Sequence, residues 1–520
     1  MRKLLGRISD FGFTGWPTFV CVLGLFASGC IARDPAVVTP LQLRAPVPLA
    51  GTLAVLDSSR HRLMRLHPGT VNAIAQDEQP LDIVPEVEKI TPDGKQVLWL
   101  NHALEKGKRR LAVLGPTGDA VTTLLPAAFS GLTIAEDSHA VVAFHAASAA
   151  QGGLVIAAEL ALVDLTASPL APRSTVIAGL ATAPLNAHLS LPVTAADGVH
   201  RVAWIDAVSA LGIADFGPAG TRTLVVPLAA AGSSAAPTAT LVPTRTVARV
   251  EGAQLHLYLV ANGSNDAVHV TLDLSQPQLA ASLDQVASGP SPVDLAVIDA
   301  GAGLRLLTVH NGANQLAYLN PATGTGTTLT LTSASHHIEK YTGADGKLHA
   351  LLWGENNPLL QRVDLEDIEK KKGKAIHDLS TPQGIVQVTA VGSQFLLHRN
   401  SAELSVYDAD QDRLTALTGT GQVKSVLTVG TTILVLGRVN VGMQLARIDV
   451  NKLSAESLDL QFPAQSVHVW GANGIALWSP GDGSGALLVF PDGALDLDSA
   501  HLAEGFGLAG SLNAAAAVAP

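Results

Sequence analysis

Residues 293–331 read VDLAVIDAGAGLRLLTVHNGANQLAYLNPATGTGTTLTL, and this stretch shows most plainly how the chain folds. Short runs rich in Val, Leu, Ile and Thr alternate with Gly, Asn and Pro, a pattern typical of strands joined by tight turns. Asn311–Gly312 and Pro321–Gly324 supply two of the turns. The predicted strands are 293–298, 304–310, 316–319 and 327–331. The stretch therefore predicts a unit of four antiparallel strands.

Units of this kind recur along the chain. Their clearest mark is an apolar strand that ends in Asp or Asn and runs into a polar turn, as at Asp273 and Asn320. Further marks follow at positions 364, 408, 449 and 490, which are 41 to 47 residues apart, and looser copies lie upstream. Four strands in a unit of this length are typical of one β-propeller blade. The sequence predicts an all-β protein with about ten four-stranded antiparallel units, in a repeat body over residues 51–513.

The number of units leaves two arrangements open. Propellers typically have about four to eight blades, so the chain forms either one large ring or two smaller propellers. The Ala- and Ser-rich run at 229–240 is the candidate internal boundary, and it could equally be a surface loop of one blade. Residues 514–520 are expected to form a flexible tail.

Two segments resemble a known repeat. Residues 309–324 (VHNGANQLAYLNPATG) look like the repeat of the YVTN-type, lactonase-like β-propellers, and residues 259–268 (LVANGSNDAV) are similar. Residues 90–95 (ITPDGK) resemble the turn between the first two strands of a propeller blade. The resemblance implies a propeller architecture. Because that family includes enzymes, binding modules and surface proteins, the resemblance implies no single activity.

The N-terminus has the features of an export signal. Arg2, Lys3 and Arg7 precede an apolar stretch over 16–27, which is shorter than the roughly 20 residues of a membrane-spanning helix. Residues 27–30 (ASGC) resemble a bacterial lipobox, whose cysteine is diacylated and becomes the new N-terminus. The resemblance implies a lipoprotein signal peptide at 1–29 and lipidation of Cys30.

A lipidated Cys30 would determine where the protein resides. Its acyl chains would attach the protein to a membrane of the bacterial cell envelope. By analogy with the same family, Ile31 favours the outer membrane, with the periplasmic or surface face left open. Residues 30–50 contain four prolines and are expected to form an extended tether. The alternative is an ordinary signal peptide followed by a cysteine that has no role.

Composition narrows the classes of function. The chain of 520 residues has 33 Lys and Arg against 44 Asp and Glu, for a net charge of −11, and 47% of its residues are hydrophobic. It is too apolar to be disordered. Its acidic excess argues against a nucleic-acid partner, because such binding depends on basic groups that neutralise phosphates. Both cysteines, Cys21 and Cys30, lie in the first 30 residues, so the body has no disulfide, thiolate metal site or cysteine nucleophile.

Several short patterns resemble known catalytic or binding motifs but lack residues or context that those motifs require. Residues 481–485 (GDGSG) lack the serine position of a hydrolase elbow, and 505–510 (GFGLAG) lack the context of a dinucleotide loop. Residues 408–412 (DADQD) begin like a calcium loop, but the later glycine and glutamate are missing. The basic clusters at 106–110 and 370–374 are predicted to be solvated loops. We predict no catalytic residue, no metal ligand and no cofactor, and the one predicted site residue is Cys30.

These features support three hypotheses. The leading one is a lipid-anchored propeller of the cell envelope that acts as a non-catalytic binding or scaffold protein for an envelope protein or glycan, with its ligand unknown. The second is a lactonase-like or metal-dependent hydrolase or lyase, with its site at the mouth of the propeller channel. The third is a structural lipoprotein that organises a larger envelope complex. The sequence leaves catalysis open and favours a protein that is not an enzyme.

Overall fold

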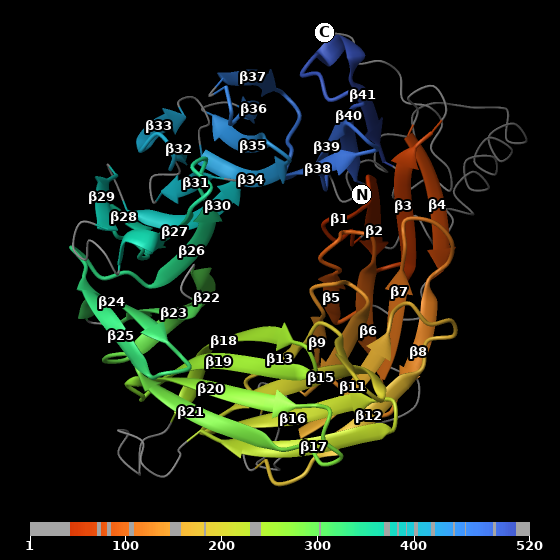
Figure 1. Ribbon diagram of the computed structural model, residues 1–520. Coiled ribbons are helices and arrows are strands. Elements are labelled where there is room, and N and C mark those ends of the chain that lie inside the picture. Colours follow the sequence, from red (N-terminus) through yellow and green to blue (C-terminus); the bar gives the residue numbers. More distant parts are fainter. Residues whose placement is uncertain are drawn as a thin grey trace, which may run out of the picture.

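A computed structural model describes the strands and most turns of the body. The described residues are 42–69, 74–80, 85–102, 109–145, 158–180, 184–228, 241–300, 303–311, 313–368, 375–381, 384–391, 393–399, 404–417, 422–439, 442–452, 454–481 and 485–505. They form ten antiparallel sheets, each built from strands that follow one another in the chain. The sheets lie around a common centre as the blades of one propeller ring (Figure 1). The all-β propeller of ten units is confirmed, and one ring is formed rather than two.

The first five blades occupy the N-terminal half of the chain. The strands of blades 1 and 2 are β1 (Val47–Leu49), β2 (Thr52–Asp57), β3 (Arg62–Pro68) and β4 (Ile74–Pro80), then β5 (Val87–Ile90), β6 (Val97–His102), β7 (Arg109–Leu114) and β8 (Val121–Leu125). Those of blades 3 and 4 are β9 (Gly131–Ile134), β10 (Ala140–Phe144), β11 (Ala158–Asp164) and β12 (Pro172–Ile177), then β13 (Asn186–Leu189), β14 (Val193–Ala195), β15 (Gly198–Ala207), β16 (Ala210–Gly217) and β17 (Gly220–Pro227). Blade 4 has five strands because β13 and β14 both pair with β15. Blade 5 consists of β18 (Val242–Glu251), β19 (Gln254–Asn262), β20 (Asp266–Asp273) and β21 (Ala281–Ala287).

The other five blades complete the ring. Blades 6 and 7 consist of β22 (Pro292–Ala300), β23 (Gly303–His310), β24 (Ala313–Asn320) and β25 (Thr325–Thr330), then β26 (His337–Thr342), β27 (Leu348–Trp353), β28 (Leu359–Asp364), the one-turn helix η4 (Leu365–Asp367) and β29 (Ile376–Ser380). Blades 8 and 9 consist of β30 (Ile385–Val391), β31 (Gln394–Arg399), β32 (Leu404–Asp408) and β33 (Arg413–Leu417), then β34 (Gln422–Val429), β35 (Thr432–Val439), β36 (Gly442–Asp449) and β37 (Ser454–Leu460). Blade 10 consists of β38 (Ser466–Trp470), β39 (Gly474–Ser479), β40 (Ala486–Phe490), the one-turn helix η6 (Leu497–Ser499) and β41 (His501–Glu504). No helix among the described residues has the length and apolarity of a membrane span.

Apolar side chains hold the ring together at every junction between blades. Each pair of neighbouring blades shares one cluster of buried apolar residues. Blades 4 and 5, for example, share a cluster that contains Ile213 and Leu257. The expected boundary at 229–240 between these blades lies outside the described residues. Both faces of each sheet are therefore buried, which explains why the inner parts of the strands are continuous apolar runs.

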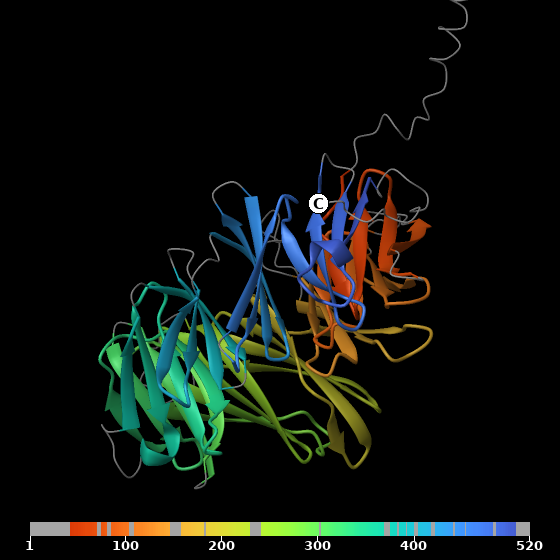
Figure 2. The ribbon, with the colours of Figure 1, turned by 90° about the horizontal axis from the view of Figure 1, so that it is seen from above.

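Blade 10 closes the ring against blade 1, and the two lie side by side in both views (Figures 1 and 2). Their shared cluster contains Leu53 of β2 and Trp478 of β39. The Gly471 N–H also donates a hydrogen bond of 2.7 Å to the Gly51 carbonyl. Gly51 has φ +83°, and a Cβ atom there would lie 2.3 Å from the Gly471 carbonyl oxygen. Glycine at residue 51 therefore permits the close approach of these two blades.

Most of the Asp and Asn residues that mark the sequence period close the turns that follow the third strands, but Asp364 precedes the one-turn helix η4 and makes no side-chain cap there. The Asp273 carboxylate accepts from the Ser275 N–H at 3.0 Å, and the Asp449 carboxylate accepts from the Asn451 N–H at 3.1 Å. The same contact, from the N–H two residues further on, is made by Asp164, Asn320 and Asp408. These are Asx turns, which Asp and Asn form because the side chain is short enough to reach its own backbone. The sequence period therefore follows these turns in most blades.

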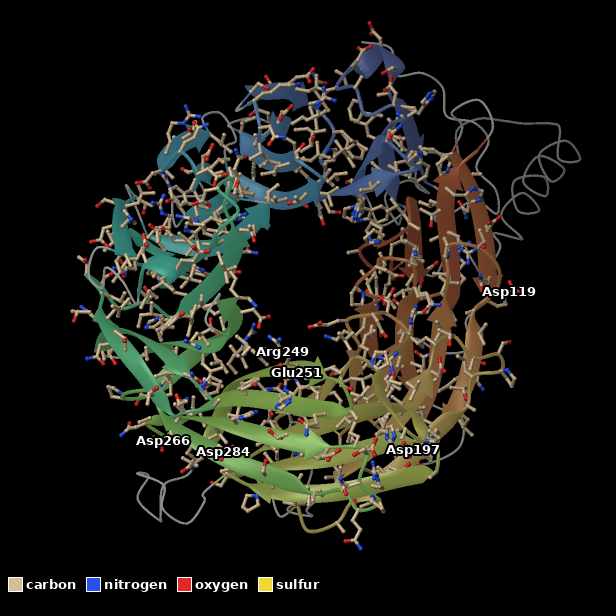
Figure 3. The ribbon with its side chains drawn as sticks, viewed as in Figure 1. Asp119, Asp197, Arg249, Glu251, Asp266 and Asp284 are labelled. Atoms are coloured by element: carbon tan, nitrogen blue, oxygen red, sulfur yellow. The ribbon has the colours of Figure 1, made fainter. Side chains whose placement is uncertain are left out.

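The order of the strands gives the ring two different faces. The first strand of each blade lies nearest the centre (Figure 1). The linkers between blades and the hairpins that join second to third strands lie on one side, which we call the linker face. The other hairpins lie on the opposite side, the hairpin face. Two ion pairs link the neighbouring first strands β18 and β22: Arg249 with Asp299 at 2.8 Å and Arg245 with Asp294 at 3.5 Å. Figure 3 shows Arg249 and Glu251 where β18 borders the centre of the ring.

Candidate functional site

The predicted site residue, Cys30, lies outside the described residues, as do the basic cluster at 370–374 and most of the cluster at 106–110. Arg109 is described: it begins β7 on the linker face and forms an ion pair of 2.5 Å with Glu86. Gln42 is the first residue that the structure describes. Its carbonyl accepts a hydrogen bond of 3.0 Å from the N–H of Ser58, the residue that follows β2. Gln42 therefore joins the ring on its linker face.

The carboxylates of residues 408–412 have separate partners. Asp408 closes its own turn, as described above. Asp410 accepts from the Ala344 N–H of blade 7 at 2.8 Å, and Asp412 accepts from the Tyr407 hydroxyl at 2.9 Å. The segment is the hairpin between β32 and β33, with its carboxylates used as hydrogen-bond acceptors.

Histidine and aspartate side chains form close pairs within blades. In blade 7, the two ring nitrogens of His349 lie 2.9 Å from Asp364 and 3.3 Å from Asp345, and His377 lies 3.1 Å from the other Asp364 oxygen. Each imidazole is thus held by carboxylates of its own sheet. Among the described residues, no group of three or more His, Cys, Asp or Glu side chains is arranged to hold a metal ion.

Two neighbouring carboxyl groups on first strands, those of Asp294 and Glu339, have raised pKa values. Burial raises the pKa of Asp294 on β22, although the Leu295 and Ile338 N–H groups donate to its carboxylate. Burial also raises the pKa of Glu339 on β26, and the nearby charge of Asp294 adds to the effect. Arg245 lies 3.5 Å from Asp294 and acts in the opposite direction. Two neighbouring carboxyl groups with raised pKa values are a candidate for acid–base chemistry.

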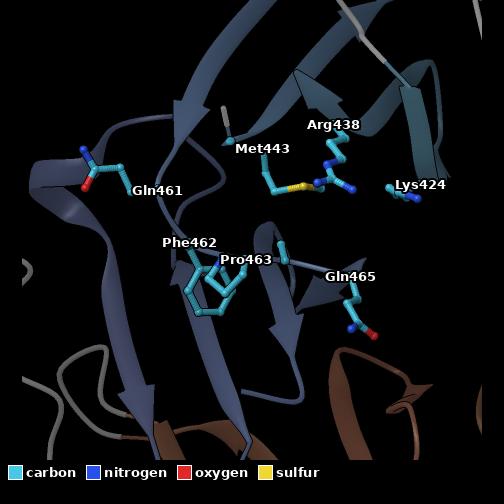
Figure 4. Close-up of a pocket in the computed structure, with 9 residues that line it drawn as sticks. Lys424, Arg438, Met443, Gln461, Phe462, Pro463 and Gln465 are labelled. Carbon is cyan, nitrogen blue, oxygen red and sulfur yellow. The ribbon is translucent and has the colours of Figure 1, made fainter. Parts of the chain in front are cut away.

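Two cavities lie on the linker face of blades 8 to 10. The first, of about 640 Å³, separates blade 9 from the linker that leads into blade 10. Arg438, Met443 and Lys424 lie along one side of it, and Phe462, Pro463 and Gln465 lie along the other (Figure 4). The remaining lining residues are Gly442, Gln461 and Ala464.

A second cavity, of about 670 Å³, lies between blades 8 and 9. Its lining residues are Val386, Gln387, Thr389, His398, Arg399, Leu404, Gln422, Val423, Lys424, Ser425, Val426 and Thr428. The buried Arg399 guanidinium donates to the Ser405 hydroxyl. Burial lowers the pKa of His398, which favours the neutral form of this imidazole. Lys424 lines both cavities, so the two adjoin at this residue.

A β-bulge places Lys424 between the two cavities. The pairing of β34 with β35 skips one residue between Val423 and Ser425, so Lys424 has no opposite residue. A bulge bends its strand and redirects the side chain of the extra residue. The inner strands β18, β22 and β30 have a bulge at the same place, where the extra residues are Thr244, Val293 and Val386. Lys424 is the one charged residue among these four.

The site is electropositive within an acidic protein. No Asp or Glu lines either cavity, although the chain has a net charge of −11. Within the described ranges, neither Lys424 nor Arg438 forms an ion pair, whereas exposed cations elsewhere do, such as Arg447 with Glu456 at 2.8 Å. An unneutralised Lys and Arg in a concave site attract an anionic group.

Sequence reasoning missed Lys424 and Arg438. No local pattern distinguishes Lys424 from other lysines in strands, because the bulge that redirects it arises from pairing with β35. The cavities themselves form between blades, where the sequence of one repeat carries no information.

Comparisons with known proteins give structural neighbours only. No family model matches the sequence, and a search of curated proteins finds no match. Among solved structures, the chain is similar to the dihydro-heme d1 dehydrogenase NirN, with 11% identity, 82% of this chain and 79% of that chain covered, and a TM-score of 0.40. It is also similar to the Dos1 propeller, with 10% identity, coverage of 67% and 89%, and a TM-score of 0.39. A third similar structure is Sqt1 of Saccharomyces cerevisiae, with 11% identity, 68% of this chain and 93% of that chain covered, and a TM-score of 0.38.

Proposed function

We propose that this chain is a lipid-anchored β-propeller of the bacterial cell envelope, which acts as a non-catalytic binding or scaffold protein. The observation that carries the proposal is the pair of cavities that share Lys424 on the linker face. Together they offer a concave surface with cations, amides and apolar side chains, and such a surface suits binding. Their lining contains no nucleophile paired with a base.

Anchoring through Cys30 is supported by the leader and by the place where the chain joins the ring. Eleven residues, 31–41, separate Cys30 from the first described residue, and they span at most about 40 Å when extended. Because Gln42 lies on the linker face, an acylated Cys30 would hold this face within reach of the membrane, and we propose the outer membrane. The proposal includes the lipoprotein signal at 1–29 and the YVTN-type kinship of the repeats.

The anchoring is tested in cells that grow with radiolabelled palmitate. Wild-type protein and the Cys21→Ala variant should incorporate label and sediment with outer membranes, because Cys21 lies within the leader. The Cys30→Ala variant should incorporate none and lose the membrane association. A Cys30→Ala protein that still fractionates with membranes would refute lipid anchoring.

The binding role is tested by capture from an envelope extract. Full-length protein in mild detergent should retain an envelope component that the Lys424→Gln, Arg438→Gln double variant does not retain. If wild type and the double variant retain the same components, a binding function at this site is contradicted. A partner retained in fixed stoichiometry would identify a structural role in a larger complex.

A second candidate function, a lactonase-like or metal-dependent hydrolase or lyase, is favoured by the carboxyl pair of Asp294 and Glu339. A carboxyl group with a raised pKa is suited to donate a proton to a leaving group. Hydrolysis of lactone or ester substrates by wild type, lost in both Asp294→Asn and Glu339→Gln, would support it. Equal turnover by wild type and variants, or no turnover, would eliminate it.

A further inference from the structure

We propose that the site around Lys424 binds a saccharide that carries an oxyanion, with the anionic group between Lys424 and Arg438. The inference rests on the proposed binding function and names the class of ligand. It is carried by the lining of the two cavities: cations without acids, several carboxamides, and an apolar wall.

The two cations specify a negative group. Lys424 lies on the bulge between the cavities, and Arg438 lies at the end of the neighbouring strand β35. Gln422 pairs with Arg438 in the register of the two strands, so the cations come from adjacent positions of one blade. Because the net charge of the protein disfavours anions at long range, recognition of an anion here depends on these local groups. An Arg and a Lys together suit a carboxylate or a phosphate.

The carboxamides specify a ligand with hydroxyl groups. Gln461 and Gln465 line the first cavity, and Gln387 and Gln422 line the second. Each side-chain amide has an NH2 group that donates and a carbonyl oxygen that accepts. A sugar hydroxyl can accept a hydrogen bond from the NH2 group and donate one to the carbonyl oxygen. All four glutamine residues are exposed, so their amides are open to a ligand.

The apolar wall and the size of the site agree with a sugar ring. Phe462, Pro463 and Met443 line the first cavity beside the two cations. An aromatic face next to polar groups can pack against the C–H groups of a saccharide, as amphipathic rings do at interfaces. Each cavity lies within the roughly 300–1,000 Å³ range of ligand sites. Since Lys424 separates them, a saccharide of two or three rings could occupy both, with an anionic group at the centre.

The test is titration calorimetry of the full-length protein in detergent with defined probes. Trigalacturonate and glucose 6-phosphate represent carboxylate and phosphate as the source of the anion, and maltotriose is the neutral control. Binding of either anionic probe, at least about tenfold tighter than maltotriose, is expected from one charge-assisted hydrogen bond. Lys424→Gln and Arg438→Gln should each weaken that binding by about tenfold or more, and Lys424→Arg should retain most of it.

Matched controls separate the site from general charge effects. Lys95 is exposed on the hairpin face, and Lys95→Gln removes the same charge from the protein without touching the cavities. A loss of binding in Lys95→Gln equal to that in Lys424→Gln would overturn the proposal. So would binding of maltotriose as tight as that of trigalacturonate, or no binding of either anionic probe.

An acidic peptide is the competing class of ligand, and triglutamate tests it. Binding of triglutamate as tight as that of trigalacturonate, with the same dependence on Lys424, would overturn the saccharide. If both anionic saccharides fail while the envelope capture still recovers a partner that depends on Lys424, the binding function stands and the saccharide proposal falls.

Discussion

The contact between blades 10 and 1 leads to the sharpest prediction about the ring. In the Gly51→Ala variant, the new Cβ would meet the Gly471 carbonyl oxygen at 2.3 Å, so the two blades must separate there. The backbone at φ +83° adds strain of about 1–3 kcal/mol for any residue other than glycine. Loss of the 2.7 Å hydrogen bond costs about 1 kcal/mol, and displacement of packed groups costs about 1–3 kcal/mol more. The clash therefore contributes about 2–4 kcal/mol in addition to the backbone strain.

A matched variant isolates the clash. Gly179 has φ +86°, and a Cβ there would meet nothing within 4 Å, so Gly179→Ala reproduces the strain alone. Chemical denaturation should show Gly51→Ala less stable than Gly179→Ala by about 2–4 kcal/mol. Hydrogen exchange should quicken in β1, β2 and β38 of Gly51→Ala only. Equal loss of stability in both variants, with no change in exchange at these strands, would refute the close contact between blades 10 and 1.

Three further predictions follow from the same structure. Burial lowers the pKa of His468 to about 4. The neutral imidazole therefore stabilises the fold above pH 6.5, and this stabilisation is lost as the pH falls towards 4. The free energy of unfolding of wild type should fall by up to about 3 kcal/mol over that range because of this group. His468→Gln should lose about 3 kcal/mol less than wild type over the same pH range in urea titrations. Identical pH profiles for wild type and His468→Gln would contradict this. Leu257→Ala, at the junction of blades 4 and 5, should lower stability by about 2–5 kcal/mol, and an unchanged unfolding midpoint would count against that junction. A protease site inserted at 229–240 should yield two fragments that stay together in native gel filtration; fragments that separate would indicate two independent propellers.

Much of the architecture could be predicted because it repeats. The quoted strands 293–298 and 304–310 correspond to β22 and β23, with slightly longer bounds in the structure. The side chains of Asp273 and Asn320 accept from the N–H group two residues further on, so their role in the turn can be predicted from the sequence of one repeat. The start of the body differs, since β1 begins at Val47, ahead of the expected residue 51. The segment around β1 has prolines typical of a tether, but the short strand gains its pairing from β2.

The number of rings and the candidate site could not be predicted, because both depend on contacts between repeats. Whether ten blades form one ring is decided where Leu53 meets Trp478, across nearly the whole length of the chain. Lys424 acquires its position from a skipped residue in strand pairing, and Phe462 lines the same cavity because the linker leads there into blade 10. No pattern within one repeat contains that information. In contrast, Cys30 is predicted from its local sequence alone and remains a prediction.

The most direct test of the binding account is hydrogen exchange of the full-length protein with and without trigalacturonate. Binding at the two cavities should slow exchange only on the linker face of blades 8 to 10, in β34 and in residues 461–465. The same experiment on Lys424→Gln should show no slowing. Protection that appears elsewhere on the ring, or that is the same in Lys424→Gln, would contradict the claim that these two cavities form the binding site.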